Sequence, residues 1–265
     1  MTGRRWPTRG ALVLVALGVF AVVAPLLAPY SPTAVDTTAA FAPVSVAHPL
    51  GTDNLGRDVL SRVLHAARTD VLLALVVTLV PLLVGTAVGV GAGWWRGWRA
   101  AAVLRVVDAV AAFPSLVLVV GLLAVTGPGL TGLLIAVPAA GWAPYARIAA
   151  AEASVAARSG VVEAQRGFAL PARRIVLRYV APHAARPCIA YGTADFAGNL
   201  VLIASVSYLG VGVQPPLPEW GAMIAEAQPY LSRGWLPAGA AAAAIVAVAL
   251  CVGVAGDRVT RGAAS

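Results

Sequence analysis

Two acidic side chains interrupt apolar runs of the sequence, where an ionisable group usually marks a path for an ion or a substrate. Asp108 follows Arg105 by one helical turn, and Asp195 stands alone in the run from residue 187 to residue 218. Burying an ionised acid at the centre of a membrane helix costs roughly 2.5–3.5 kcal/mol. Arg105 can form a structural ion pair with Asp108, whereas Asp195 has no evident local partner. Asp195 is therefore the stronger candidate for a substrate path, and Asp108 is the second.

A larger set of charged side chains forms an arginine-rich island from Glu152 to His183, between long apolar runs. Glu152 and Glu163 are its only acids, and the chain contains no lysine. A helix, a break at Leu170-Pro171 and a second amphipathic helix would present a polar surface to a soluble partner. In a membrane protein this segment must lie in water, and its arginines predict the cytoplasmic side.

The sequence gives little support for catalysis. A Walker A loop requires Gly-Lys-Ser/Thr, which a chain without lysine does not supply. No Ser-His-Asp set is evident, and His48 and His65 have no nearby cysteine or second histidine to complete a metal site. Gly89, Gly91 and Gly93 lie in an apolar stretch, where close helix packing explains them. We therefore expect no enzyme activity, no cofactor and no metal site, so uphill transport would draw its energy from a partner or an ion gradient.

The composition predicts a membrane protein. Hydrophobic residues make up 60% of the 265 residues and charged residues only 11%, whereas about a quarter of the residues in soluble domains are charged. The net charge of +8 could indicate nucleic acid. Basic residues that hold loops on the cytoplasmic side and contact anionic lipid explain this charge better. We expect a lipid membrane as the environment and no nucleic acid as a partner.

Uncharged windows predict an all-α, polytopic fold with six transmembrane helices. The first window, Ala11 to Ala28, is long for the core of a signal peptide and long enough to span, so we interpret it as a retained helix. The other windows are 71–95, two within 109–145 separated at Gly127-Pro128-Gly129, 187–218, and the stretch between Arg233 and Asp257. Before the second window, Leu55, Val59 and Val63 predict a short amphipathic helix on the membrane surface, capped by Thr52 or Asp53.

The arginines orient these six spans with both termini in the cytoplasm. Four arginines then lie outside and the other fifteen inside; the four are Arg57, Arg62, Arg68 and Arg233. The opposite topology would reverse the positive-inside bias. The predicted parts are a cytoplasmic N-terminus with the first helix (1–35), an extracytoplasmic segment with the interfacial helix (36–69), a core of five spans with the cytoplasmic loop 147–186 (70–258), and a cytoplasmic tail (259–265).

Four stretches, in the right order, resemble permease subunits of ATP-binding cassette importers. They are HPLGTDNLGRDVLSR at His48–Arg62; Arg105, Asp108, Phe113 and Pro114; Trp142, Tyr145, Ala146 and Arg147; and LGVGVQPPLPEWGAM at Leu209–Met223. The chain is similar to the peptide/nickel/opine family, dipeptide-permease C type, over nearly its whole length. The resemblance implies the type I importer-permease architecture, with a cytoplasmic coupling-helix loop.

The arginine-rich island resembles the EAA loop of this family, whose coupling helix inserts into a groove on an ATPase subunit. The resemblance implies that the ATPase-coupling residues are Glu163, Ala164, Gln165, Arg166, Gly167, Ala169, Leu170 and Pro182. Gln165 replaces the second alanine of the motif, Ala169 replaces its glycine, and His183 replaces the Asn after the proline. If that glycine requires a positive φ, alanine costs on the order of 1 kcal/mol or more there, unless Gly167 or the Leu170-Pro171 bend provides the turn.

The resemblance implies a multi-pass subunit of the bacterial inner membrane that transports but does not hydrolyse ATP. The implied partners are a second, homologous permease subunit, two cytoplasmic ATPase subunits and an extracytoplasmic substrate-binding protein. Dipeptides, oligopeptides, nickel chelates, opines and other metallophores remain open as cargo. Two alternatives fit less well. A gradient-driven secondary transporter would require inverted repeats and mid-membrane acids, of which only Asp195 is in place, and a non-transporting scaffold would leave uptake intact when the chain is deleted.

Overall fold

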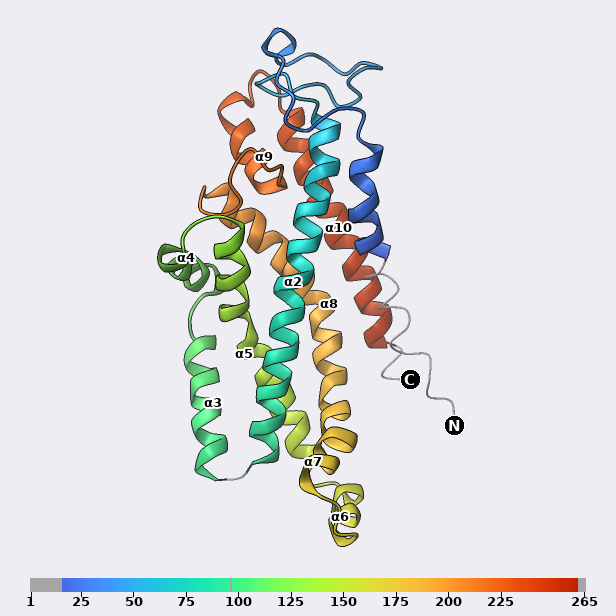
Figure 1. Cartoon of the computed structure of the whole chain (residues 1–265), viewed down its shortest axis with the longest axis vertical. Coiled ribbons are helices and arrows are strands. Elements are labelled where there is room, and N and C mark those ends of the chain that lie inside the picture. The colour runs from blue at the N-terminus through green and yellow to red at the C-terminus, as the bar shows by residue number, and fades with distance from the viewer. Residues whose placement is uncertain (1–15, 96, 262–265) are drawn as a thin grey trace. The chain divides into compact units, whose positions relative to one another are not determined.

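The computed structural model describes residues 16–95 and 97–261, which form helices and turns. Within these ranges no strand occurs, and a single isolated bridge joins Thr52 and Asp58. In chain order (Figure 1), the elements after the helical residues 16–23 are η1 (Ala24–Leu27), η2 (Thr37–Ala39), α2 (Val59–Trp94), α3 (Trp98–Ala111), α4 (Ser115–Thr126), α5 (Leu130–Ala156), α6 (Gly160–Gly167), α7 (Ala172–Ile175), η3 (Val176–Val180), α8 (Ala181–Tyr208), α9 (Trp220–Ala227), η4 (Gln228–Tyr230) and α10 (Leu236–Arg261).

Four helical segments are long and apolar enough to cross a membrane, namely α2, α5, the continuous segment Ala172–Tyr208 and Leu236–Val254 of α10. Helices α3 and α4 give a fifth span if they are counted together, although they are bent by 92°. Pro114 lies at this bend, where it lacks an N–H and disfavours helix at Phe113. The apolar helix Ala16–Leu27 is shorter, and its predicted start at residue 11 lies outside the described residues. The all-helical membrane fold is confirmed, while the number of six spans stays a prediction.

Large apolar side chains remain exposed along these helices. The exposed fraction is 68% for Leu83 on α2, 86% for Val125 on α4 and 62% for Leu250 on α10. Exposed apolar surface of this extent is unfavourable in water, whereas a bilayer covers it. The helices therefore have the apolar surface that membrane spans require.

The chain divides into two compact units. The first contains the described residues up to 76 together with 120–135 and 193–261, and the second contains 77–119 and 136–192. In the first unit, the helix predicted on the membrane surface is instead the beginning of α2, which runs unbroken to Trp94. Asp58 begins α2, since its Oδ2 accepts a hydrogen bond from the Ser61 N–H at 2.8 Å. The sequence pattern located this helix but missed its continuation, because apolar periodicity alone does not mark a boundary.

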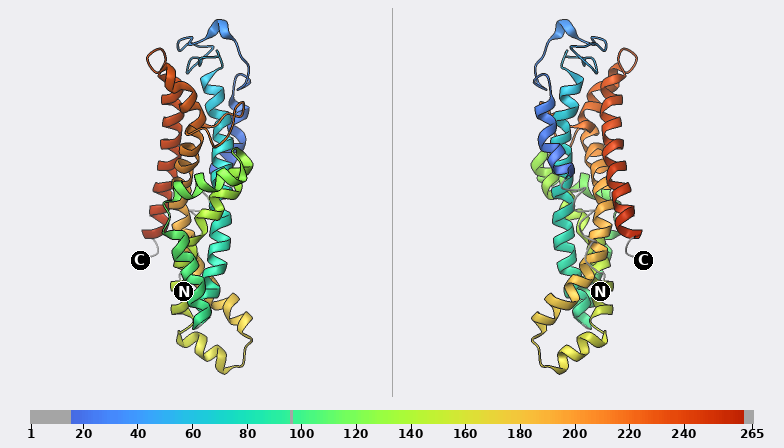
Figure 2. Two further views of the ribbon diagram at one scale, coloured as in Figure 1. Left: turned by 90° about the vertical axis from the view of Figure 1, so that its left-hand side faces the viewer. Right: turned by 90° about the vertical axis from the view of Figure 1, so that its right-hand side faces the viewer.

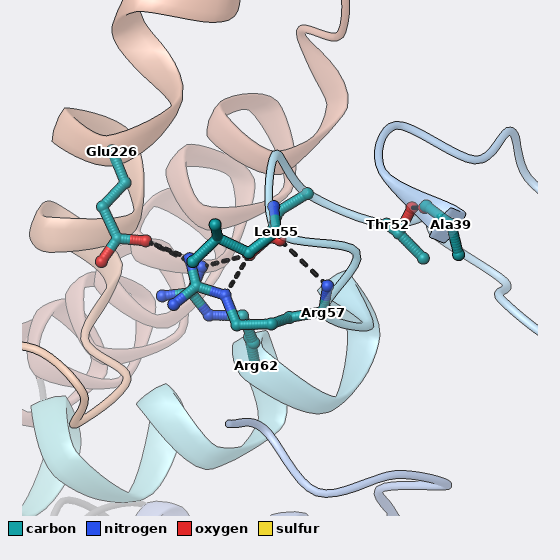
Figure 3. A network of polar contacts seen from close by, with 7 residues as sticks. Ala39, Thr52, Leu55, Arg57, Arg62 and Glu226 are labelled. Atoms are coloured by element: carbon teal, nitrogen blue, oxygen red, sulfur yellow. Dashed lines mark hydrogen bonds and ion pairs between the residues drawn. The ribbon is translucent and has the colours of Figure 1, made fainter. Parts of the chain in front are cut away.

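A buried ionic network in the first unit connects the loop before α2 with α9 (Figure 3). Asp53 accepts hydrogen bonds from Arg57 Nε at 2.7 Å and from Arg62 at 2.6 Å, and both arginines also reach Glu226 of α9. The side chains of Asp53, Arg57 and Arg62 are at most 8% exposed. Removing one partner would leave an uncompensated buried charge, which costs about 3–5 kcal/mol. Two of the four arginines assigned to the outer side therefore hold the fold together.

Helix α9 is further fixed by its first residues. The Trp220 backbone N–H donates to Asp70 Oδ2 at 3.0 Å, and its indole N–H donates to the Val63 carbonyl at 3.2 Å. Glu219 caps the helix by accepting from the Ala222 N–H at 2.6 Å. Burial raises the pKa of the Glu219 carboxyl, because water no longer solvates its charged form.

In the second unit, α2 and α5 pack with their backbones in contact. A Cβ atom on Gly85, Gly89 or Gly93 would come closer than 3.0 Å to the carbonyl oxygen of Trp142, Ala146 or Ala150, respectively. Glycine alone permits this approach. The predicted packing role is confirmed for Gly89 and Gly93, whereas Gly91 faces the Trp95 ring instead. Helix positions four apart lie on one face, so Gly85 completes the row.

Candidate functional site

The arginine-rich island folds as the predicted helix, break and second helix. Helix α6 begins after Ser159, whose Oγ accepts a hydrogen bond from the Val162 N–H at 3.4 Å, and it ends at Gly167. Residues 168–171 form the break, and α7 begins at Ala172. Figures 1 and 2 show α6 and α7 as a hairpin beyond the adjoining ends of α5 and α8. The loop therefore projects from the second unit.

Ala169 provides the turn at the end of α6. Its φ is 54°, in the left-handed region. The Ala169 N–H donates to the Arg166 carbonyl at 2.9 Å, and the Leu170 N–H donates to the Gln165 carbonyl at 3.3 Å. This pair of hydrogen bonds defines a Schellman motif, which usually has glycine at the position of Ala169. The conditional expectation of a positive φ here is confirmed, and Gly167 does not take over the turn.

Apolar side chains on the inner side of the loop anchor it to the second unit. Val162, Ile175 and Val180 are at most 1% exposed and pack in a core with residues of α5 and α8, among them three alanines of α5. Leu170 is partly buried against the same core. Because the loop shares its core with α5, a force on α6 is transmitted to that helix.

The exposed side chains of the loop include two apolar residues and an acid. Val161 is 58% exposed and Phe168 is 74% exposed, and Glu163 lies exposed between them in the sequence. Within the described ranges, Glu163 forms no ion pair. An exposed aromatic residue on an anchored helix is typical of a protein interface. Val161 and Phe168 were not among the predicted site residues, although a large aromatic side chain in a polar stretch could have indicated Phe168.

The other predicted coupling residues have varied environments. Ala164 is exposed and Gln165 is partly exposed on α6. The Arg166 guanidinium lies 4.7 Å from the centre of the Trp94 ring, a cation–π contact with the end of α2. Arg166 is therefore directed towards the end of α2.

Pro182 lies exposed at the start of α8 and shapes the joint with α7. The turn η3 between them has π geometry, and the Ala181 N–H donates to the Val176 carbonyl five residues earlier. Proline has no N–H and its ring clashes with the carbonyl four residues before it, which belongs to Arg178. The wider π turn relieves this clash. Next to Pro182, His183 Nε2 lies 3.4 Å from Glu152 Oε2 on α5.

Each of the two predicted substrate-path acids has a polar partner. Asp108 on α3 pairs with Arg147 on α5 at 2.5 Å, so the predicted partner, Arg105, is wrong. Asp195 on α8 accepts a hydrogen bond from Asn199 Nδ2 at 3.0 Å. The expectation that Asp195 lacks a local partner is wrong too, and the spacing of four residues could have indicated Asn199.

The two histidines weighed as metal ligands have structural contacts. His48 Nδ1 lies 2.9 Å from Asp58 Oδ1, and His65 Nδ1 lies 2.8 Å from the Ser61 carbonyl oxygen. In the described part of the chain, no three His, Cys, Asp or Glu side chains come together as metal ligands. Both histidines stabilise the beginning of α2.

Comparison with known proteins identifies the family. Residues 85–261 match the family described as binding-protein-dependent transport system inner membrane component. The chain is 33% identical to the di/tripeptide transport system permease protein DppC of Pseudomonas aeruginosa (strain UCBPP-PA14) over 94% of this chain and 84% of that protein. It is 37% identical to the dipeptide transport system permease protein DppC of Escherichia coli (strain K12) over 93% and 84%. It is 30% identical to the probable D,D-dipeptide transport system permease protein DdpC of the same strain over 93% and 83%.

The family match includes the α2–α5 packing, the loop with α6 and the membrane-spanning helices that follow it. The relatives match nearly the whole chain, including the segment before α2. The chain therefore belongs to the family of binding-protein-dependent transport system inner membrane components, the permease subunits of ATP-binding cassette importers.

Proposed function

We propose that this permease imports short peptides and is coupled to a cytoplasmic ATPase through α6. The observation that carries the coupling proposal is that Val161, Glu163 and Phe168 are exposed on a loop that Val162 and Ile175 anchor in a core. The peptide cargo is inferred from the names of the relatives, which are permeases for dipeptides and tripeptides. ATP hydrolysis belongs to the partner subunits in this proposal.

The mechanism follows from the attachment of the loop. An ATPase that binds α6 more tightly in one nucleotide state shifts the permease towards the matching conformation, because only differential binding moves an equilibrium. The core shared by Val162, Ile175 and the alanines of α5 transmits this shift to the spans. A second permease subunit completes the path, and an extracytoplasmic binding protein delivers the peptide.

Asp195 is the residue that we propose for the substrate path. Its carboxylate is partly buried and oriented by Asn199, and its charge is complementary to the ammonium group of a peptide. Asp108 is a weaker candidate, because Arg147 already neutralises its charge.

Co-purification tests the coupling surface. The tagged chain is co-expressed with the neighbouring ATPase and permease genes and extracted in mild detergent, and the recovered ATPase is quantified. We expect Phe168→Ala and Glu163→Arg to lose most of the ATPase, since a buried aromatic anchor carries more than about 2 kcal/mol of an interface. Val155→Ala is the matched control, because Val155 is 65% exposed but lies on α5 and not on α6.

Peptide uptake gives the second measurement. Both loop variants should abolish ATP-dependent uptake while Val155→Ala retains it. Unchanged ATPase recovery and uptake in Phe168→Ala and Glu163→Arg would refute coupling through α6. Normal ATPase recovery by wild type without any peptide uptake would refute only the proposal that the cargo is a peptide.

A further inference from the structure

A groove of about 780 Å³ in the second unit is lined in part by Arg166 of α6. It is lined by the end of α2, the first turns of α3, the second half of α5 and the Arg166 side chain. This volume is within the range of ligand-binding pockets, about 300–1,000 Å³. Its apolar lining includes Leu104 and alanines of α5. The groove can hold a molecule with an apolar part and a polar end.

The charges in the groove favour an anion. Arg147, Arg158 and Arg166 line it, and Asp108 is the single carboxylate among the described lining residues. Each guanidinium has five N–H donors, and the described contacts engage few of them. Arg147 donates to Asp108, Arg158 donates to the Ser154 carbonyl at 3.2 Å, and Arg166 stacks on Trp94. Donors remain for the oxygens of a phosphate group.

Tryptophans place the groove at the level of lipid headgroups. Trp94 and Trp95 line it at the end of α2, and Trp98 begins α3 with 76% of its surface exposed. Tryptophan is enriched where a membrane meets water, because its ring is amphipathic. A molecule in this groove therefore meets acyl chains on one side and water on the other.

We propose that the groove binds an anionic glycerophospholipid, with the headgroup phosphate at Arg147 and Arg158 and an acyl chain along the apolar lining. Basic pockets between membrane helices bind anionic headgroups by the same combination of charge and depth. The bound lipid would fill the space between α3 and α5 in the second unit. Retention of the lipid is independent of peptide cargo and of ATPase recovery, so failure here leaves the proposed function standing.

Native mass spectrometry tests this site on the purified chain, alone and with the subunits that co-purify. The probes are dioleoyl phosphatidylglycerol and dioleoyl phosphatidylcholine, which share acyl chains but differ in net charge. Wild type should retain phosphatidylglycerol preferentially. Arg158→Gln should reduce that retention about fivefold, which is the usual effect of one basic residue near anionic lipid. Asp108→Asn should increase it, because it removes the opposing charge and releases Arg147.

Arg174→Gln is the matched control, since Arg174 is exposed on α7 and does not line the groove. Retention by this variant should equal that of wild type. Equal retention of the two lipids by wild type, or a loss in Arg174→Gln as large as in Arg158→Gln, would overturn the proposal. Displacement of the bound lipid by millimolar inorganic phosphate would also overturn the proposal, because the groove would then be a site for a free anion. Retention of the lipid by the isolated chain but not by the complex would overturn it too, because a partner subunit would then occupy the groove.

Discussion

At the scale of a single residue, Ala169 adopts a left-handed backbone conformation that glycine adopts without cost. Its φ of 54° lies where an L-residue is disfavoured by about 1–2 kcal/mol. The two hydrogen bonds of the Schellman motif and the partial burial of Leu170 hold it there. The backbone of the loop is therefore strained at Ala169, the residue directly after the exposed Phe168.

Ala169→Gly should stabilise the folded loop by about 0.5–1 kcal/mol. The free energy gained by relieving the backbone strain exceeds the cost of the greater conformational entropy of glycine in the unfolded chain. The measurement is the rate of tryptic cleavage after Arg166, which reports local opening and should fall about two- to fivefold. Ala164→Gly, at an exposed helical position of the same α6, should have the opposite effect. Equal cleavage rates in the two variants would contradict the assignment of strain.

At the scale of single residues, the sequence predicted the turn at Ala169 but not which side chains of the loop are exposed. The turn at Ala169 was expected from the resemblance to the EAA motif, because Ala169 replaces the glycine of that motif. The exposure of Phe168 could not be inferred, because a single apolar residue outside a periodic pattern has no face assigned to it. The partner of Asp108 was missed because Arg147 lies 39 residues away in the sequence.

At the scale of the elements, the packing of α2 on α5 rests on Gly85, Gly89 and Gly93. Gly89→Ala should lower the free energy of unfolding by about 1–3 kcal/mol, because the added carbon meets the Ala146 carbonyl and forces the helices apart. The melting temperature in one detergent measures this loss. Gly121→Ala on α4 is the control, since its Cβ would meet no atom within 4 Å, and it should be neutral or stabilising. Equal melting temperatures for Gly89→Ala and wild type would exclude the close packing.

Breaks between elements were predictable where the residues themselves enforce them. Gly127-Pro128-Gly129 separates α4 from α5 as expected, and the two glycines have positive φ. The start of α2 was not predictable to the same degree, because residues 59–69 are compatible with both a short surface helix and the first turns of a long one. No glycine or proline stands between them and the apolar run, so the helix continues.

At the scale of the whole molecule, composition and charge predicted a helical membrane protein, and the structure confirms it. The number of spans stays a prediction, since the pair of α3 and α4 is bent by 92° and the predicted start of the first span lies outside the described residues. The orientation rests on the arginine distribution and is open to a direct test.

Cysteine labelling tests this orientation. The chain is expressed without its partners in a Cys251→Ser background, because Cys251 is exposed whereas Cys188 is buried. A membrane-impermeant maleimide should label Val46→Cys, at a fully exposed position of the segment before α2, in intact cells. Phe168→Cys should react only after permeabilisation. Labelling of Phe168→Cys from outside would reverse the topology and place α6 beyond the reach of a cytoplasmic ATPase.

The row of glycines on α2 also limits how the gene can change. Every amino acid that replaces glycine through a single base substitution carries a Cβ atom. At Gly85, Gly89 and Gly93 that atom meets a carbonyl oxygen of α5, so these codons have no neutral missense neighbours. At Gly121 an added Cβ atom meets open space. Purifying selection should therefore conserve every fourth codon along this part of α2, whereas the codon of Gly121 on α4 should tolerate a change to alanine.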